Sequence, residues 1–365
     1  MTQLSTHRHP RLLILPGLFL TLALASVPAQ AAPLPALAAY GADPGQTSVS
    51  GMSSGAFMAA QFSVAFSATV VGAGIVAGGP FYCAGLFAPT LPAQAASSVC
   101  MAPVGSGPRA SAALNFASAF AEKGQIDSLS GLARQKIYIF SGTKDQVVKQ
   151  KVVDQTAKFF ALAGVKAANL KYVNNIAAGH ALLTDSPANN ACGTTAAPFI
   201  NNCGYQQARE ILKWIYGPLQ EAGDRPAGQL SMFDQAPFDP AGKATLGPIG
   251  YVYVPDACEK AACRIHVAFH GCLQGERTLG DRYARTTGYN ETAAGNRIIV
   301  LYPQIAASSR NPLGCWDFWG YTAPDDTVHP DFYSKQAPQH AAIASMLKRL
   351  SEARPSPDQT TEPRR

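Results

Sequence analysis

Charged residues are scarce in this chain of 365 residues: 14% are charged and 47% are hydrophobic, with a formal net charge of +6. The sequence has no cluster of lysine and arginine, which argues against a nucleic-acid-binding surface. It contains neither a CxxC nor an HExxH motif, so we expect no metal site and no cofactor. Beyond residue 31 no apolar run reaches about 18 residues, and we expect no membrane span. The mild charge favours a neutral or weakly charged substrate.

The N-terminus has the pattern of an export signal. A basic segment from His7 to Arg11 precedes an apolar run from Leu12 to Ala25, and Ala29-Gln30-Ala31 forms a small-x-small cleavage site. We predict a signal peptide over residues 1–31 and a secreted mature protein, periplasmic or extracellular, that begins near Ala32. A buried N-terminal helix is the alternative interpretation. Because residues 1–31 contain two arginines and no acidic residue, their removal lowers the net charge to +4.

Cysteine is present in an even number, eight residues in all. An even number in an exported chain predicts disulfide bonds. Sequence alone leaves many pairings open. The simplest expectation joins neighbours in the sequence: Cys83 with Cys100, Cys192 with Cys203, Cys258 with Cys263, and Cys272 with Cys315.

Strand and helix patterns alternate along the chain after the predicted signal. This alternation predicts an α/β fold, a mostly parallel sheet with helices on both faces. We expect one catalytic domain over residues 32–352, a disordered polar tail over 353–365, and loops or linkers over 84–109 and 217–250. The predicted strands are Gln46–Ser50, Val70–Ala77, Lys136–Phe140, Leu170–Val173, Tyr251–Val254, Arg264–Phe269 and Arg297–Tyr302. The predicted helices are Gly55–Ser67, Ser111–Lys123, Val147–Leu162, Gln206–Tyr216, Asp281–Ala294 and Gln336–Glu352.

The segment Gly51-Met52-Ser53-Ser54-Gly55 fits the G-x-S-x-G motif and lies between a predicted strand and a predicted helix. Glycines permit a tight strand-to-helix turn in which a Cβ would collide. Such a turn would lift the Ser53 hydroxyl out of the sheet and direct the N–H of Ser54 at a developing oxyanion. We therefore predict Ser53 as a nucleophile, with an ordinary turn as the alternative.

A serine hydroxyl needs a base that takes its proton. His180 follows a predicted strand in a Gly-His turn, where a parallel sheet presents catalytic loops, and we predict it as that base. Other histidines fit the role less well. His266 lies inside a predicted strand, where packing is the simpler role, and His329 lies on a polar loop. His340 lies on the last predicted helix, where we expect it to be solvated.

The imidazole in turn needs a carboxylate that holds its tautomer. Asp145 follows the strand Lys136–Phe140 and lies between Ser53 and His180 in the chain, so we predict it in this role. Asp154 lies inside a predicted helix and Asp185 beyond the base, and each is the weaker candidate. The order Ser…Asp…His is that of the α/β-hydrolase fold.

The second oxyanion donor has an unusual place in the sequence. In α/β-hydrolases a loop upstream of the serine supplies it. Here the matching pattern, the strand Arg264–Phe269 followed by His270-Gly271-Cys272, lies downstream of the whole predicted triad. We infer a circular permutation, possible where the chain termini are close, that sets the N–H of Cys272 opposite that of Ser54. An ordinary turn at residues 270–272 is the alternative.

Together these stretches resemble the secreted poly(3-hydroxybutyrate) depolymerases whose catalytic domain is circularly permuted. The resemblance covers about residues 47–321 and depends on SGMSSGAFMAAQFSVAFS, GAGIVAGGPFYCA, SGTKDQVV, AAGHAL, VAFHGCLQ, VLYPQ and GCWDFWGY. It implies an α/β-hydrolase fold, a triad of Ser53, Asp145 and His180, and an oxyanion hole made of the Ser54 and Cys272 amides. It further implies aromatic contacts to a polyester chain, with Trp316, Trp319, Tyr302 and Tyr321 as candidates. Ordinary core packing is the alternative for these aromatic residues, and for Phe318 it is the interpretation that we favour.

The resemblance implies a serine esterase that hydrolyses a polyester or oligoester to 3-hydroxyacids. Many relatives carry a polymer-adsorbing domain after the catalytic one. We expect none here, which favours amorphous polymer or short oligomers as substrates. Two other functions stay open: a feruloyl- or acetylxylan-type carbohydrate esterase, and a non-catalytic polymer-binding protein on a hydrolase scaffold.

Overall fold

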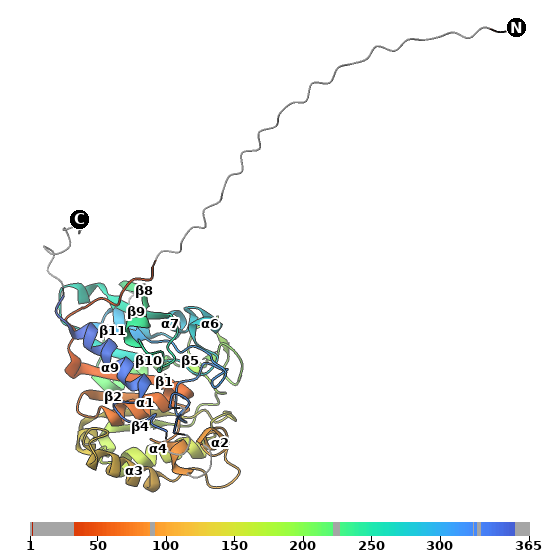
Figure 1. The fold of residues 1–365 in the computed structure, drawn as a ribbon, viewed down its shortest axis with the longest axis vertical. Coiled ribbons are helices and arrows are strands. Elements are labelled where there is room, and N and C mark those ends of the chain that lie inside the picture. Colours follow the sequence, from red (N-terminus) through yellow and green to blue (C-terminus); the bar gives the residue numbers. More distant parts are fainter. Residues whose placement is uncertain are drawn as a thin grey trace. The chain divides into compact units, whose positions relative to one another are not determined.

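Eight strands form the central sheet of the computed structural model: β1 (Thr47–Met52), β2 (Val70–Val76), β3 (Lys136–Phe140), β4 (Leu170–Val173), β8 (Gly228–Asp234), β9 (Ile249–Pro255), β10 (Arg264–Phe269) and β11 (Ile298–Tyr302). Their order is β4-β3-β2-β1-β10-β11-β9-β8 (Figure 1). The strands from β4 to β11 in this order run parallel, whereas β9 and β8 are antiparallel to their neighbours. The apolar runs of β3 and β11 are almost entirely buried, as expected for parallel strands covered on both faces.

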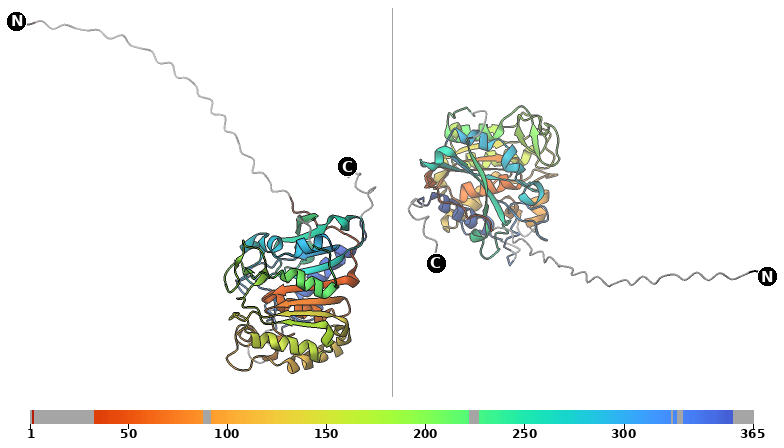
Figure 2. Two further views of the ribbon diagram at one scale, coloured as in Figure 1. Left: turned by 180° about the vertical axis from the view of Figure 1, so that it is seen from behind. Right: turned by 90° about the horizontal axis from the view of Figure 1, so that it is seen from above.

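Helices cover both faces of this sheet and enclose two apolar cores. One core includes residues of α1 (Ser54–Ala65), α3 (Ala110–Glu122), α4 (Gln150–Leu162) and α9 (Pro338–Ser351). The other includes residues of α5 (Gln207–Tyr216), α7 (Arg282–Thr286) and α8 (Tyr289–Ala294). Figure 2 shows the sheet from behind, with the green helix α5 lying over it. These layers confirm the predicted α/β fold.

The structure describes residues 2, 33–87, 92–221, 227–323, 325, 326 and 330–354. The chain divides into two units, and the second, from Leu34 onward, holds all the elements above. The predicted signal peptide falls on the first unit, Met1–Pro33, and lies almost wholly outside the described residues. His329 and residues 355–365 of the predicted tail also lie outside them. Within the described part of the chain no helix is long and apolar enough to cross a membrane.

The two halves of the chain build two halves of the sheet. Strand β1, the first in the chain, pairs in parallel with β2 on one side and with the much later β10 on the other. The start and the end of the fold meet: the N–H of Tyr40 donates to the carbonyl of Leu350 (3.1 Å), and the N–H of Gly41 donates to that of Glu352 (2.8 Å). This is the arrangement that the predicted circular permutation requires.

Two segments that we predicted as loops or linkers contain regular structure, so these predictions were wrong. Residues 84–109 include the helix α2 (Pro92–Ser98), which a disulfide between Cys83 and Cys100 ties to the preceding 3₁₀ turn. Residues 217–250 include the edge strand β8, which pairs with β9 over its whole length. The helix predicted over Asp281–Ala294 is divided into α7 and α8, with Gly288 between them at φ +86°.

The cysteines form four disulfides, in the pairs that sequence neighbours predict. They are Cys83–Cys100, Cys192–Cys203, Cys258–Cys263 and Cys272–Cys315. The second of these closes the region that carries a small additional sheet of β5 (Leu182–Thr184), β6 (Asn190–Ala191) and β7 (Ile200–Asn202). This small sheet directly follows His180 in the chain.

Candidate active site

The predicted nucleophile lies in a sharp turn between β1 and α1. Ser53 has φ 57° and ψ −122°, a conformation that costs a non-glycine residue of order 1–3 kcal/mol. The flanking glycines leave no space for a side chain. A Cβ on Gly51 would lie 2.1 Å from the carbonyl oxygen of Gly55, and a Cβ on Gly55 would lie 2.4 Å from that of His270. The motif thus marks a strained strand-to-helix turn rather than an ordinary one.

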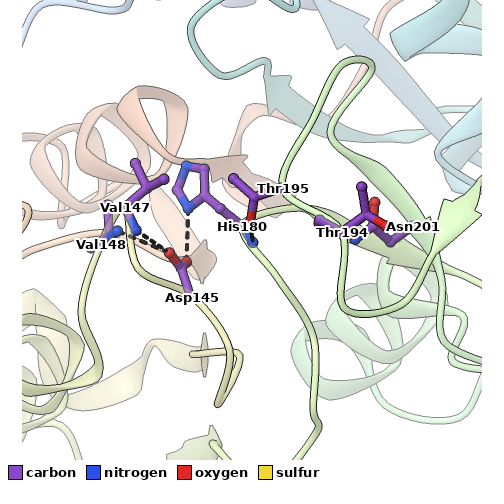
Figure 3. A network of polar contacts seen from close by, with 7 residues as sticks. All are labelled: Asp145, Val147, Val148, His180, Thr194, Thr195 and Asn201. Atoms are coloured by element: carbon purple, nitrogen blue, oxygen red, sulfur yellow. Dashed lines mark hydrogen bonds and ion pairs between the residues drawn. The ribbon is translucent and has the colours of Figure 1, made fainter.

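The predicted carboxylate and base are in direct contact. Oδ2 of Asp145 lies 2.7 Å from Nδ1 of His180, and both residues are buried (Figure 3). The other oxygen, Oδ1, accepts the N–H groups of Val147 (2.8 Å) and Val148 (3.0 Å). Because a carboxylate accepts, the ring donates from Nδ1, which leaves Nε2 of His180 able to take a proton. Figure 3 shows this second nitrogen directed away from Asp145.

Backbone hydrogen bonds between neighbouring strands bring these residues to the same edge of the sheet. The N–H of Ser53 donates to the carbonyl of Val76 at the end of β2 (2.9 Å), and that of Lys144 donates to Ala178 (3.1 Å). The Ser53 turn and the loops carrying Asp145 and His180 therefore all follow the carboxyl ends of parallel strands. Within the described residues Ser53 and His180 share no hydrogen bond, so their pairing stays a prediction.

The loop after β10 lies against the Ser53 turn. Strands β1 and β10 pair with Gly51 opposite Phe269, so the two chains leave the sheet side by side. A Cβ on Gly271 would lie 2.9 Å from the sulfur of Met52, the residue before Ser53. This close approach is what an oxyanion hole built from the Ser54 and Cys272 amides needs.

A cavity of about 280 Å³ opens beside Ser53 and Cys272. Its other walls are mostly apolar, and Arg310 is the single cation among the described residues that line it. The remaining lining residues come from α1, from α2 and the turn after it, and from the segment 313–319: Phe57, Ala93, Ala96, Ser97, Met101, Leu313, Cys315, Phe318 and Trp319.

Comparisons with known proteins show the family to which the chain is similar. No protein-family model matches the chain. A poly(3-hydroxybutyrate) depolymerase from Delftia acidovorans is 41% identical over 316 residues, which are 85% of this chain and 60% of that relative. A polyhydroxybutyrate depolymerase from Talaromyces funiculosus is 36% identical over 307 residues, 78% of this chain and 85% of the relative. The chain belongs to the poly(3-hydroxybutyrate) depolymerase family.

Solved structures of the depolymerase family superpose on this chain. A PHB depolymerase from Penicillium funiculosum has a TM-score of 0.75 and 32% identity. A serine-to-alanine variant of a PHB depolymerase complexed with an R3HB trimer has a TM-score of 0.76 and 31% identity. Each comparison covers 87% of this chain and 98% of the other. These results confirm the α/β-hydrolase fold and the resemblance, while the chain spans only 60% of the length of the Delftia relative.

The aromatic residues predicted as polymer contacts of this depolymerase-family chain lie in different surroundings. Tyr302, the last residue of β11, is fully buried, and its hydroxyl donates to Oδ1 of Asn290 in α8 (2.7 Å). Its side chain belongs to the core under α8 and is not among the residues that line the cavity. Trp316 is also fully buried. Tyr321 is buried as well, and its hydroxyl donates to the carbonyl of Cys315. Trp319 does line the cavity.

Phe318, which we predicted as a packing residue, both packs and lines the cavity. Its ring stacks on that of Phe57 with a centroid distance of 4.1 Å. The neighbouring Asp317, which sequence reasoning missed, organises this segment: its Oδ1 accepts the N–H groups of Trp319 (3.1 Å) and Gly320 (2.6 Å). Burial raises the pKa of Asp317, and these hydrogen bonds oppose that effect. The carboxylate thus fixes the loop that presents Trp319 to the cavity.

A second set of serine and histidine side chains lies inside the sheet. His266 contacts the hydroxyl of Ser48 through Nδ1 (2.6 Å) and that of Ser50 through Nε2 (2.7 Å). All three residues are completely buried, and burial lowers the pKa of His266 to about 3. With both nitrogens occupied in the interior, His266 joins β1 to β10 and cannot serve as a base for substrate. Its predicted packing role is consistent with this.

His340 is buried, so the prediction of a solvated side chain was wrong. Helix α9 packs it edge-on against Phe62, and its Nδ1 contacts the carbonyl of Ser334 (2.7 Å). Burial lowers the pKa of His340 to about 4. The ring is therefore neutral near pH 7 and belongs to the core under α9.

Proposed function

We propose that this chain is a secreted serine esterase that hydrolyses poly(3-hydroxybutyrate), or related short-chain polyhydroxyalkanoates and their oligomers, to 3-hydroxyacids. Membership of the depolymerase family supports the substrate class. The observation that carries the proposal is the contact between Asp145 and His180 at the sheet edge where the strained Ser53 also lies. Acyl transfer requires an activated serine next to an oriented imidazole, and the pairing of Ser53 with His180 is part of this proposal.

In the first half of the reaction Ser53 Oγ attacks the ester carbonyl carbon while Nε2 of His180 takes the hydroxyl proton. The carbonyl oxygen becomes an oxyanion, which accepts hydrogen bonds from the Ser54 and Cys272 amides. One such donor contributes about 3–4 kcal/mol to the transition state. When the tetrahedral intermediate collapses, His180 gives its proton to the leaving hydroxyl group and the acyl chain stays on Ser53.

In the second half a water molecule attacks the acyl carbonyl, and His180 takes its proton. The second tetrahedral intermediate uses the same two amides. Collapse returns the proton to Ser53 Oγ and releases a 3-hydroxyacid. Asp145 keeps the ring proton on Nδ1 throughout and stabilises the imidazolium that forms twice in each turnover.

The cavity suits an uncharged polyester. Phe318, Trp319, Met101 and Leu313 line it, so a methyl-substituted chain would bury apolar surface against them. Trp319 is the aromatic residue that we propose as a direct polymer contact. Arg310 is the one charged residue that the described part of the chain contributes to the cavity wall, and the substrate proposal does not depend on it.

Export fits the chemistry of the cysteines. Four disulfides form within the described residues, and such bonds persist in oxidising compartments. Together with the signal peptide predicted over residues 1–31, they support a periplasmic or extracellular location. Sequencing the N-terminus of the protein recovered from culture medium and periplasm would test both points.

The activity test compares the polyester with plant-polysaccharide esters. Purified protein should clear a suspension of amorphous poly(3-hydroxybutyrate) and release 3-hydroxybutyrate, but release little ferulate or acetate from plant-polysaccharide esters. Ser53→Ala should abolish turnover of the polymer and of p-nitrophenyl butyrate. Ser63→Ala, a buried serine of the same helix that contacts the carbonyl of Ala60, is the matched control and should retain turnover. Full activity of Ser53→Ala would refute the proposed chemistry, and preferential release of ferulate or acetate would refute the proposed substrate.

A further inference from the structure

His180 lies in an irregular segment between β4 and β5, so no helical or strand hydrogen bond holds the backbone of the base. Two successive N–H groups of this segment donate to a later stretch of the chain instead. The N–H of Gly179 donates to the carbonyl of Cys192 (2.9 Å). The N–H of His180 itself donates to the side-chain hydroxyl oxygen of Thr195, also at 2.9 Å (Figure 3). The position of the base therefore depends on a segment that follows it in the chain.

We name residues 192–203 the histidine clamp. A disulfide between its two end residues closes it. Asn201 is completely buried and braces the clamp from inside, because its Nδ2 donates to the carbonyls of Cys192 (2.9 Å) and Thr194 (2.7 Å). Both hydrogens of that amide are thus in use. These contacts fix the shape of the clamp independently of His180.

The clamp also packs tightly against the backbone next to His180. A Cβ on Gly179 would lie 2.3 Å from the carbonyl oxygen of Thr194. On the other side, the carbonyl of Ala178 accepts the N–H of Lys144, in the loop that also carries the carboxylate of the triad (3.1 Å). The segment with the base is thus enclosed between the carboxylate loop and the clamp.

We propose that Thr195 is a positioning residue: its hydroxyl oxygen holds the N–H of His180 and so keeps the imidazole within reach of Ser53. The inference rests on the proposed function, because it takes His180 as the base. Thr195 is exposed, is not among the described residues that line the cavity, and moves no proton. Its effect is on the distance over which the proton is transferred. A displacement of about 1 Å can lower the rate of an enzyme about 100-fold.

Thr195→Val keeps the shape of the side chain and removes the acceptor. A water molecule can then accept the N–H of His180 at this exposed position, so the melting temperature should change little. That water is not attached to the clamp and does not fix the ring. We expect kcat to fall about 5- to 20-fold, less than for a full displacement because the Gly179 contact remains, with KM within about twofold. Thr195→Ser restores a hydroxyl and should recover kcat to within about threefold of the parent.

Thr194→Val is the matched control, because it makes the same substitution at the adjacent residue of the clamp. The Thr194 hydroxyl makes no hydrogen bond with any residue that the structure describes, and its carbonyl, which Asn201 holds, is unchanged by the substitution. With p-nitrophenyl butyrate as substrate, kcat of this variant should stay within about twofold of the parent. The ¹H NMR signal of the proton between Nδ1 of His180 and Asp145 reports on the ring itself. That proton should exchange with water faster in Thr195→Val than in the parent or the control.

A kcat of Thr195→Val equal to that of the parent would overturn the inference, as would a loss that Thr194→Val matches, that is confined to KM, or that Thr195→Ser does not recover. If Thr195→Val does not fold, Thr195→Ala replaces it, because it removes the same acceptor from an exposed position.

His180→Ala separates this inference from the proposed function. Full turnover of p-nitrophenyl butyrate by His180→Ala would refute the assignment of the base, and the inference with it. An inactive His180→Ala together with a fully active Thr195→Val would refute the inference alone. A parent protein that cleaves p-nitrophenyl butyrate but not poly(3-hydroxybutyrate) loses its proposed substrate, whereas the test of Thr195 proceeds unchanged.

Discussion

Replacing Asp145 by asparagine should remove most of the activity while leaving the fold intact. Oδ1 of Asp145 accepts two backbone N–H groups, from Val147 and Val148, whereas Oδ2 faces Nδ1 of His180. An asparagine oxygen would stay against those two donors, because the opposite orientation would set the NH₂ group against them. The NH₂ would then face Nδ1 of His180, and the ring proton would move to Nε2.

A proton on Nε2 leaves His180 unable to accept the proton of Ser53. The corresponding change in a serine protease triad costs about 10⁴-fold in kcat, which is about 5 kcal/mol of activation free energy. We expect a loss of this size for Asp145→Asn, with a melting temperature close to that of the parent. Asp145→Ala should differ, because it leaves the buried N–H of Val148 and the part-buried N–H of Val147 without their acceptor. A buried N–H without an acceptor costs about 1–3 kcal/mol of stability.

Steady-state hydrolysis of p-nitrophenyl butyrate measures the loss of kcat, and ¹⁵N NMR of the His180 ring reports which nitrogen carries the proton. Thermal unfolding of both variants provides the control for structure. A kcat within tenfold of the parent in Asp145→Asn would refute this reasoning. So would an imidazole that remains protonated on Nδ1.

Two further predictions concern stability. Gly55→Ala should lower the free energy of unfolding by about 1–3 kcal/mol or more, because the added Cβ would lie 2.4 Å from backbone atoms at the end of β10. The control is Gly105→Ala, where no atom lies within 4 Å of the added Cβ. This control should be nearly neutral in urea unfolding. An equal effect at both glycines would contradict the packing argument. Burial holds the pKa of His340 at about 4 in the folded state, below about 6.5 in the unfolded chain. The unfolded chain therefore binds one more proton between these values, and stability falls as the pH drops from about 6.5 toward 4. His340→Gln should reduce that slope by about one proton in urea titrations, and an unchanged slope would contradict its burial.

The sequence predicted the nucleophile turn because its constraints are local. Gly51 and Gly55 are required within a few residues of Ser53, and the motif reports that requirement directly. Strands such as Lys136–Phe140 were equally predictable, since a buried parallel strand is a continuous apolar run.

Elements that depend on distant partners were missed. Strand β8 is a half-exposed edge strand with few apolar residues, and its pairing with β9 defines it. Helix α2 lies in a segment rich in proline, alanine and serine, next to a disulfide. Neither contact can be read from composition, because tertiary partners decide the structure of such segments.

The positions of the side chains around the site also depend on distant partners that the sequence does not show. The resemblance predicts Tyr302 as a substrate contact. A strand residue faces one side of the sheet or the other, and the motif does not give the side. In the structure Tyr302 packs toward α8. His340 was expected in solvent because helical spacing does not give the width of the buried face of α9. Met101 and Leu313, in contrast, enter the cavity wall from segments without any catalytic pattern.

The start and the end of the fold meet at a junction, the hydrogen bond between Tyr40 and Leu350, which has a practical consequence for attaching the protein to a support. The junction lies near the starts of β1 and β10, because Asp43 donates its N–H to the carbonyl of Cys263. Ser53 follows the other end of β1, a strand of six residues, or about 20 Å of extended chain. A tag or an immobilising anchor at either end of the fold is therefore attached at the edge of the sheet opposite the cavity. Proteins tethered in this way would present their cavities outward to a polymer film.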